Sequence, residues 1–277
     1  MKGKGSGVAS FETGLDVLAA FDRESPQLTL LEIANRCKIT RFAARRYLQS
    51  LTKLGLAEAD GKHYGLTQRA LRAGSVYLSS SPLVAKAQPL LLRLTAQTSE
   101  SSYLWLQDGP QAIVIAKATP NKITNRSHSI GAHFPLFVTS AGMVIAAQQS
   151  PEALNALLKA YRPHPYTRRT ILNIEHVRAE VAKVLQQGYC VSERQLDDLV
   201  RGIAVPVFDP SGGFVGAVST NLFVASESTH ASLHRLLGKL KSIADALQGP
   251  RAAMSADPVS ARSRRNPLLT RRRKSTR

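Results

Sequence analysis

The sequence is poor in cysteine, with only Cys37 and Cys190 among its 277 residues. Two distant cysteines do not make the disulfide framework of a small secreted protein, and neither has another Cys or a His at zinc-site spacing. Cys190 lies in an apolar run and is expected to be a packed side chain rather than a nucleophile. Uninterrupted apolar stretches of the roughly 18 residues needed to span a membrane are also missing. No apolar segment follows the basic N-terminal residues, so we expect a cytoplasmic protein without a signal peptide.

Signatures of catalysis are equally scarce. The sequence contains no P-loop, dinucleotide-binding fingerprint or nucleophile elbow. Asp197 and Asp198 are adjacent, and adjacent side chains diverge rather than converge on one substrate. His230 and His234 lie four residues apart near Glu227, which suits a metal, but a third ligand is not evident and such pairs are usually solvated. We therefore expect no enzyme, no catalytic residues, no metal and no cofactor.

Acidic residues are few, since 19 Asp and Glu stand against 37 Lys and Arg and give a formal net charge of +18. Residues 250–277 alone hold nine basic side chains and one acidic side chain. A basic surplus indicates a polyanionic partner, most often nucleic acid, because binding releases condensed counterions. The alternative is a tail that keeps the protein soluble or binds any polyanion. This segment is rich in Arg and lacks aromatic residues, so we expect it to be disordered.

Residues 10–67 carry, in order, the signals of a winged helix-turn-helix. Apolar residues at helical spacing predict a first helix from Ser10. Thr29-Leu30-Leu31-Glu32 is a capping-box pattern that begins a second helix. Thr40 is a suitable N-cap for a third helix, which Gly55 would end in the left-handed conformation. Two short strands around Asp60-Gly61 then predict a type I′ hairpin, the wing.

The third helix has an apolar face and a basic face. At about 100° per residue, its core-facing side chains are Ala44, Tyr47, Leu48 and Leu51. We assign DNA contact to the opposite face and to the wing: Arg41, Phe42, Arg45, Arg46, Gln49, Lys53, Lys62 and His63. In the major groove Arg reads guanine, Gln reads adenine and an apolar ring can contact a thymine methyl. The wing would contact phosphate or the minor groove. The alternative is a merely solvated face, which would not need Phe42.

The rest of the chain predicts an α+β domain. A linking helix is expected over 67–77 and a long helix over 83–98, interrupted or kinked near Pro89. Strands are expected at 102–107, 111–118, 189–193, 201–208 and 214–223, and further helices at 139–149, 151–160, 174–187 and 226–248. Strands grouped together with helices at either end favour an antiparallel sheet.

Several motifs occur in order along the chain: Leu28-Thr29-Leu30-Leu31-Glu32-Ile33-Ala34, Leu51-Thr52-Lys53-Leu54-Gly55, Tyr64-Gly65-Leu66-Thr67, Thr139-Ser140-Ala141-Gly142, Gln187-Gly188-Tyr189 and Gly202-Ile203-Ala204-Val205-Pro206-Val207-Phe208-Asp209. With them, residues 10–249 resemble the IclR family of bacterial regulators. Residues 43–48 and 203–207 look most like the branch that governs aromatic-acid catabolism through the β-ketoadipate pathway. The resemblance implies a GAF-like effector domain, small carboxylate effectors, and a homodimer formed through the N-terminal domains, often a homotetramer.

The resemblance also implies an effector pocket. By motif position it includes Ile123, Arg126, Phe134, Ser140, Ala141, Val200, Gly202, Ser219 and Asn221. Ser192 or Glu193 stands where the family usually has an aspartate, and Met143 replaces the commoner basic residue after Gly142. The Arg126 guanidinium could clamp an effector carboxylate, with apolar neighbours suited to an aromatic ring. The alternative is that Arg126 is a solvated loop residue.

These observations combine into a fold class, a domain plan and a function. We expect an α+β chain with a winged helix-turn-helix and a GAF-like antiparallel-sheet domain. The segments are a disordered tail (1–9), the DNA-binding domain (10–67), a linker helix (68–81), the effector-binding domain (82–249) and a basic disordered tail (250–277). The expected function is a sequence-specific transcription regulator that binds double-stranded operator DNA and a small, aromatic carboxylate effector. The alternatives are an enzyme with a winged-helix accessory domain and a non-specific basic nucleic-acid-binding protein.

Overall fold

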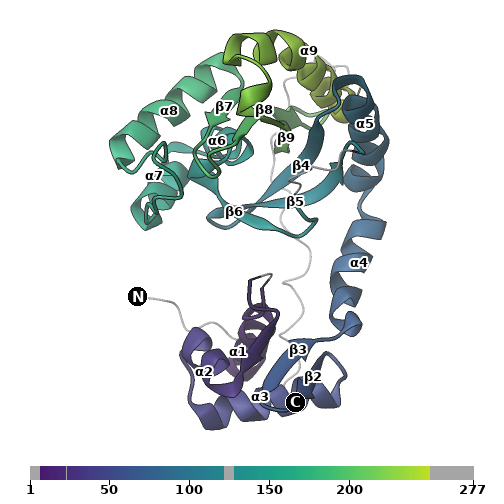
Figure 1. The fold of residues 1–277 in the computed structure, drawn as a ribbon, viewed down its shortest axis with the longest axis vertical. Helices are drawn as coiled ribbons and strands as arrows, with labels where there is room; N and C mark the ends of the chain where they lie inside the picture. Colours follow the sequence, from purple (N-terminus) through teal and green to yellow (C-terminus); the bar gives the residue numbers. More distant parts are fainter. Residues whose placement is uncertain (1–6, 23, 122–127, 250–277) are drawn as a thin grey trace, which may run out of the picture.

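The computed structural model describes residues 7–22, 24–121 and 128–249. The chain forms two separately packed parts joined by α4 (Leu71–Ser80), which stands alone between them (Figure 1). The predicted pocket residues Ile123 and Arg126, and the predicted basic tail at 250–277, lie outside the described residues.

The N-terminal part is a winged helix-turn-helix, as predicted. Its elements are α1 (Ala9–Ala19), β1 (Gln27–Thr29), α2 (Leu30–Cys37), α3 (Arg41–Lys53), β2 (Ala57–Asp60) and β3 (His63–Leu66). The capping box is present, because Thr29 Oγ1 accepts from the Glu32 amide while the Glu32 carboxylate accepts from the Thr29 amide. The Thr40 hydroxyl caps α3 by accepting from the Ala43 amide, and Gly55 after the helix has φ +70°.

The core of this part comes from one face of each helix. Ala44, Leu48 and Leu51 of α3 are buried against Val17 of α1 and Ile33 of α2. The predicted first helix therefore forms, but it buries Val17 rather than the residues at its start. Phe11 and Leu15 are 67% and 51% exposed and form an apolar outer face of α1.

The wing corrects the predicted turn type. Asp60 pairs with His63, so Gly61 and Lys62 are the two central residues of the hairpin. A type I′ turn needs positive φ at both central positions, whereas Gly61 has φ +62° and Lys62 is not in the left-handed region. Glycine alone at the first central position is the pattern of a type II′ turn, which also suits the twist of a hairpin.

The linker is attached to the end of α3. A short 3₁₀ turn, η1 (Gln68–Ala70), precedes α4. Thr67 Oγ1 donates to the Gly55 carbonyl, and Arg69 Nη1 donates to the Leu54 carbonyl at 3.0 Å. These two bonds join the start of the linker directly to the C-terminus of α3.

The C-terminal part is an α+β domain built on an antiparallel sheet, as predicted. Its elements are α5 (Pro82–Thr98), β4 (Ser101–Asp108), β5 (Gln111–Ala118), β6 (His133–Pro135), η2 (Leu136–Val138), α6 (Ser140–Ala147), α7 (Pro151–Ala160), α8 (Ile174–Gln187), β7 (Cys190–Glu193), β8 (Val200–Phe208), β9 (Phe214–Phe223), η3 (Val224–Ser226) and α9 (Thr229–Gln248). Among the described residues the strand order is β6-β5-β4-β9-β8-β7. The helix α5 continues through Pro89, and β6 was not predicted.

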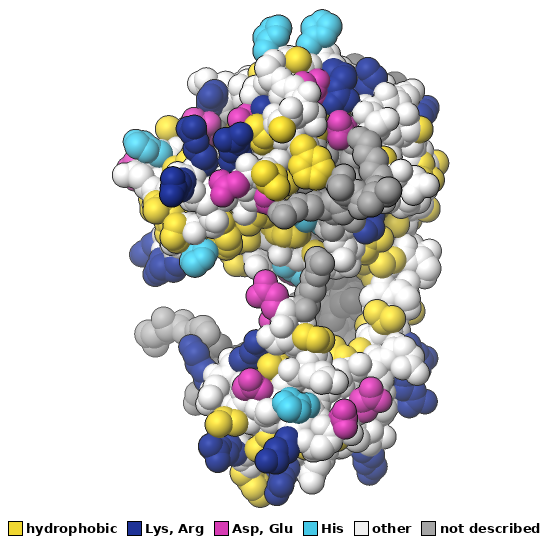
Figure 2. Space-filling view, viewed as in Figure 1, with side chains coloured by type: hydrophobic (Ala, Val, Ile, Leu, Met, Phe, Trp, Pro, Cys, Tyr) yellow, Lys and Arg dark blue, Asp and Glu magenta, His cyan; other side chains and the backbone are white. Residues whose placement is uncertain are grey.

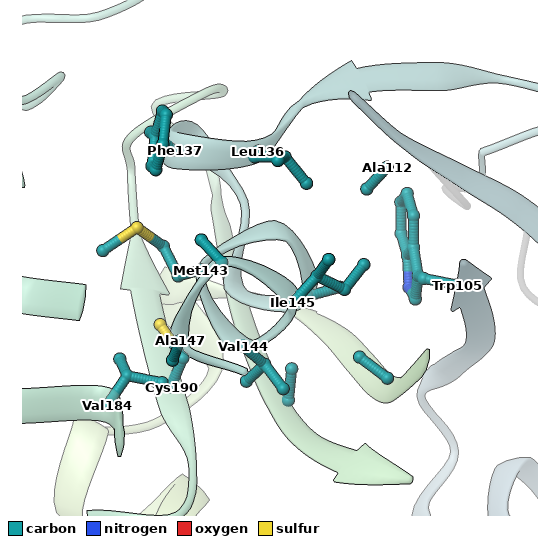
Figure 3. Packing of buried hydrophobic residues seen from close by; sticks show 14 of the residues in the cluster. Trp105, Ala112, Leu136, Phe137, Met143, Val144, Ile145, Ala147, Val184 and Cys190 are labelled. Atoms are coloured by element: carbon teal, nitrogen blue, oxygen red, sulfur yellow. The ribbon is translucent and has the colours of Figure 1, made fainter. Parts of the chain in front are cut away.

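Helices cover both faces of the sheet (Figure 1). The helices α5 and α9 pack on one face, where Leu104, Ile203 and Val218 are buried. The helix α6 packs on the other face, and α8 packs against α6. Every residue of α6 is buried, and Figure 3 shows this helix in the middle of its cluster, with Ile145 on the side of Trp105. The polar start of α6 is thereby fixed against the sheet.

None of the described helices combines the length and the apolar character that crossing a bilayer requires.

Candidate effector cavity and DNA-reading face

A cavity of about 750 Å³ lies between the start of α6 and the sheet. Its size falls in the range of small-molecule sites, roughly 300–1,000 Å³. Its walls are formed by Glu24, Trp105, Gln111, His128, His133, Phe134, Pro135, Val138, Thr139, Ser140, Ala141, Tyr166, Ser192, Gln195, Leu196, Asp197, Val200, Gly202 and Asn221. Polar and apolar groups therefore line the same cavity.

The N-terminus of α6 opens onto this cavity. The Thr139 hydroxyl caps the helix by accepting from the Gly142 amide at 3.0 Å, and the Thr139 carbonyl accepts from the Met143 amide. The first-turn amides of Ser140 and Ala141 have no acceptor within the helix, and both residues line the cavity. Two amides at the positive end of a helix dipole favour an anion such as a carboxylate.

A row of small polar residues crosses the sheet beneath this helix. Strand pairing places Ser192, Gly202 and Asn221 side by side on β7, β8 and β9. A Cβ atom on Gly202 would lie 2.6 Å from Ser140 Oγ, so the helix approaches the sheet closely at this point. Asn221 Nδ2 lies 3.0 Å from His128 Nε2. Hydrogen-bonding groups are thus concentrated at the α6 end of the cavity.

Aromatic rings form the adjoining wall. The His128 ring lies 4.4 Å from Phe134 and 5.5 Å from Trp105, measured between centroids. Trp105 packs edge-on against Phe134 at 5.6 Å, and its Nε1 donates to Ser219 Oγ at 2.8 Å. Burial raises the pKa of the neighbouring Tyr103, whose hydroxyl accepts from the His128 amide. Fixed ring edges and faces suit a planar aromatic ligand.

Two loops that are fastened together form the wall on the β7 side. The Thr170 hydroxyl donates to the Gln195 carbonyl at 2.7 Å, and Gln195 Oε1 accepts from the Ile171 amide at 2.9 Å. Thr167 Oγ1 also donates to the Arg194 carbonyl. These bonds hold Tyr166 and Gln195, from different loops, at the same cavity.

Most of the described pocket residues expected from the resemblance lie at this cavity, although their roles stay predictions. Those that line it are Phe134, Ser140, Ala141, Ser192, Val200, Gly202 and Asn221. Ser219 lies beneath the wall, where it accepts from Trp105. Strand alternation separates Ser192 from Glu193, so Glu193 lies on the opposite face of the sheet from the cavity. Met143 is buried in the core on the side of Phe137 (Figure 3) and is not part of the cavity wall.

Glu193 belongs to an ion pair with a buried arginine. The Arg201 side chain is 3% exposed, and its Nε donates to Glu193 Oε2 at 2.9 Å. Arg201 Nη1 donates to the Glu227 carbonyl and to Ser232 Oγ, and Thr229 Oγ1 donates to the same Glu193 oxygen. The pair therefore fastens β7 and β8 to the start of α9.

Several cavity residues carry no sequence motif that would single them out. Trp105 and His128 are the clearest cases, because each is placed by tertiary packing. Trp105 stands two residues after Tyr103 in a strand-like run, which places both side chains on one face. That alternation is the one signal that would have identified this part of the wall from sequence.

The residues assigned to DNA contact form an exposed surface. Every one of them is exposed: Arg41, Phe42, Arg45, Arg46, Gln49, Lys53, Lys62 and His63. Phe42 is 72% exposed, although it is a large apolar side chain. Figure 2 shows Lys and Arg side chains, with a hydrophobic one among them, at the end of the molecule where Figure 1 places α3.

The residues weighed for other chemistry are engaged in structural contacts. Glu227 forms an ion pair in which its Oε1 lies 2.6 Å from Arg235 Nη2. Within the described ranges, no group of three or more His, Cys, Asp or Glu side chains could hold a metal ion. Burial raises the pKa of the Cys190 thiol to about 12, which keeps it protonated and unreactive at neutral pH.

A winged helix-turn-helix joined to an α+β domain that contains a cavity is the architecture of a transcriptional regulator. Two family descriptions match consecutive parts of the chain: "IclR helix-turn-helix domain" over residues 10–61 and "Bacterial transcriptional regulator IclR C-terminal" over residues 75–248. The chain belongs to the IclR family, whose members are transcriptional regulators and not enzymes.

Among its relatives, a Pca regulon regulatory protein from Pseudomonas putida is 34% identical over 78% of this chain and 75% of that protein. Two further relatives come from Acinetobacter baylyi, a Pca operon regulatory protein and a p-hydroxybenzoate hydroxylase transcriptional activator. Each is 32% identical over 76% of this chain, and the matched regions span 78% of the first protein and 80% of the second.

Solved structures share the fold. An IclR transcriptional regulator from Alicyclobacillus acidocaldarius superimposes with a TM-score of 0.76 at 22% identity, over 87% of this chain and 98% of that one. An IclR homolog from Microbacterium hydrocarbonoxydans, complexed with 4-hydroxybenzoate, gives a TM-score of 0.68 at 19% identity, over 87% and 99%.

Proposed function

We propose that this protein binds operator DNA through α3 and the wing, and that an aromatic carboxylic acid in the cavity controls this binding. The observation that carries the effector assignment is the meeting of two features in one cavity. The first-turn amides of α6 suit a carboxylate, and the rings of Trp105, His128 and Phe134 suit an aromatic ring. The names of the relatives support the same class, since they regulate Pca genes and p-hydroxybenzoate hydroxylase.

The DNA assignment rests on α3. Its inner face is packed by Ala44 and Leu48, so the helix is held rigidly while Phe42, Arg45 and Arg46 project outward. A protein helix fits the major groove, where Arg pairs with guanine and an apolar group meets the thymine methyl. In a dimer, two such helices would address half-sites about 34 Å apart. The exposed apolar face of α1, with Phe11 and Leu15, supports contact between two N-terminal domains.

Control would follow from linkage between the two sites. An acid that binds one arrangement of the N-terminal domains more tightly than another shifts the population towards it. The linker carries such a change, because Thr67 and Arg69 are hydrogen-bonded to the end of α3.

Fluorescence anisotropy with the protein's own promoter DNA tests the proposal, with and without protocatechuate or 4-hydroxybenzoate. We expect specific binding whose affinity changes with one of the acids. The double variant Arg45→Ala/Arg46→Ala should lose specific binding, whereas Arg93→Ala, at an exposed position on α5, should not. Equal affinity for promoter and random DNA in the wild type would support non-specific binding through the basic residues instead. Deleting 250–277 should leave specific binding intact and reduce only its salt dependence.

A further inference from the structure

One residue of the cavity wall does not come from the C-terminal domain. Glu24 lies in the connection between α1 and β1, within the DNA-binding domain, yet it lines the same cavity as Tyr166, Gln195 and Asp197. Figure 1 shows this connection rising from the N-terminal domain towards the sheet edge that carries β6. The cavity is therefore continuous from the first turn of α6 to the DNA-binding domain.

The residues beside Glu24 are braced to α2. Arg36 of α2 donates through Nη1 to the Ala20 carbonyl at 2.8 Å and to Asp22 Oδ2 at 2.9 Å. Its Nη2 donates to Ser25 Oγ at 2.6 Å, and the Ser25 amide donates to Asp22 Oδ1 at 2.7 Å. Arg36 thus contacts this connection on both sides of Glu24, and α2 packs directly against α3.

We propose that Glu24 is part of the effector site, so that the DNA-binding domain senses the bound acid directly as well as through the linker. The proposal rests on the proposed function of the cavity. Glu24 brings a carboxylate to the part of the wall where the two domains meet. An acid whose carboxylate is held at the α6 end adds a negative charge to the cavity that Glu24 lines, and this charge repels Glu24 across the cavity. The acid therefore favours arrangements in which Glu24 has moved away. Through Arg36, that movement displaces α2 and with it the DNA-reading helix.

The geometry can be tested without any effector, because Trp105 is the sole tryptophan of the sequence and lines the cavity. A nitroxide label is placed at Glu24→Cys in a Cys37→Ser background, where the buried Cys190 stays unlabelled. The label should strongly quench Trp105 fluorescence in the full-length protein. The same label at Glu58→Cys, an exposed position of β2, is the control and should quench little. Equal quenching from both positions would overturn the proposal.

Titration with 4-hydroxybenzoate and protocatechuate, followed by calorimetry, tests the electrostatic part. The acid that binds the wild type should bind Glu24→Gln at least about twofold more tightly, because a repulsive charge is removed. In this variant the acid should change the affinity for DNA less than it does in the wild type. Glu58→Gln should leave acid affinity unchanged. An unchanged acid affinity and an unchanged acid effect on DNA binding in Glu24→Gln would refute the role of Glu24. If neither acid binds the wild type, the proposed effector class fails, while the quenching result still decides where Glu24 lies.

Discussion

Gly202 and Ser140 approach so closely that a Cβ atom on Gly202 would lie 2.6 Å from Ser140 Oγ. Gly202 is on β8, and Ser140 is the first residue of α6. The same Cβ would lie 3.2 Å from Asn221 Oδ1, so two polar groups of the cavity face the glycine. The absence of a side chain at this position lets the helix N-terminus meet the polar row of the sheet.

Replacing Gly202 with alanine should therefore disturb the carboxylate end of the proposed site. We expect Gly202→Ala to lower the free energy of unfolding by about 1–3 kcal/mol, as for an overpacked core, and to weaken acid binding at least tenfold. Urea denaturation and calorimetric titration measure the two effects. Gly238→Ala on α9 is the matched control, because its Cβ would meet nothing within 4 Å. Wild-type acid affinity in Gly202→Ala would show that the acid does not use this end of the cavity.

Removing only one member of the ion pair between the buried Arg201 and Glu193 should lower the free energy of unfolding. Arg201→Met leaves Glu193 without its cation, but the Glu193 side chain is 36% exposed and water moderates the loss. We expect a decrease of about 1–3 kcal/mol in the free energy of unfolding. The double variant Arg201→Met/Glu193→Gln should be less destabilised than the two single effects added together. Additive effects in this double-mutant cycle would mean that the pair does not interact.

The ionisation of Glu193 should make the stability of the fold depend on pH. Burial opposes its ionisation, but hydrogen bonds from Thr229 and Arg201 outweigh burial and lower its pKa below the usual 4.5. A carboxyl with a lowered pKa in the folded state stabilises the fold above its unfolded-state pKa, and this contribution is lost as the pH falls through the folded-state pKa. Glu193→Gln should therefore lose less stability than the wild type between about pH 5 and pH 3. Parallel acid-denaturation curves for the two proteins would contradict this assignment.

The sequence predicted those features that depend on local chemistry. The Thr29 capping box, the Thr40 cap and the glycine after α3 each follow from neighbouring residues, and the structure contains all three. The turn at Gly61 was assigned to the wrong type, because a Gly after Asp is compatible with more than one primed turn and only the φ of Lys62 distinguishes them.

The site was less predictable, because it is assembled from distant segments. Family motifs led to Gly202 and Asn221, but His128 reaches the cavity through packing on Phe134 and Trp105, which no local pattern encodes. The choice between Ser192 and Glu193 required the strand register, since a shift of one residue exchanges the two faces of a strand.

The linker helix α4 provides a test of coupling with an internal control. Ser75 lies in the interior of α4, where proline removes a backbone hydrogen bond and clashes with the preceding turn. Ser75→Pro should leave acid binding and DNA binding measurable but greatly reduce the effect of one on the other. Ser75→Ala changes the same position without interrupting the helix backbone and should retain coupling. If Ser75→Pro responds to acid like Ser75→Ala, an intact α4 is not required.

Phe42 and Arg46 should contribute to DNA binding in different ways. Phe42 is uncharged and 72% exposed, so Phe42→Ala should cost specific affinity, about 1–2 kcal/mol, without changing how binding depends on salt. Arg46→Ala should weaken DNA binding. If Arg46 contacts a phosphate, the slope of log affinity against log salt concentration should fall by about 1. If Arg46 reads a base, the base preference at one operator position should relax instead. Anisotropy titrations at several salt concentrations, on the promoter and on single-base variants, separate these effects. Unchanged specific affinity in Phe42→Ala would place the ring outside the DNA interface and leave its exposure to be explained by contact with another protein surface.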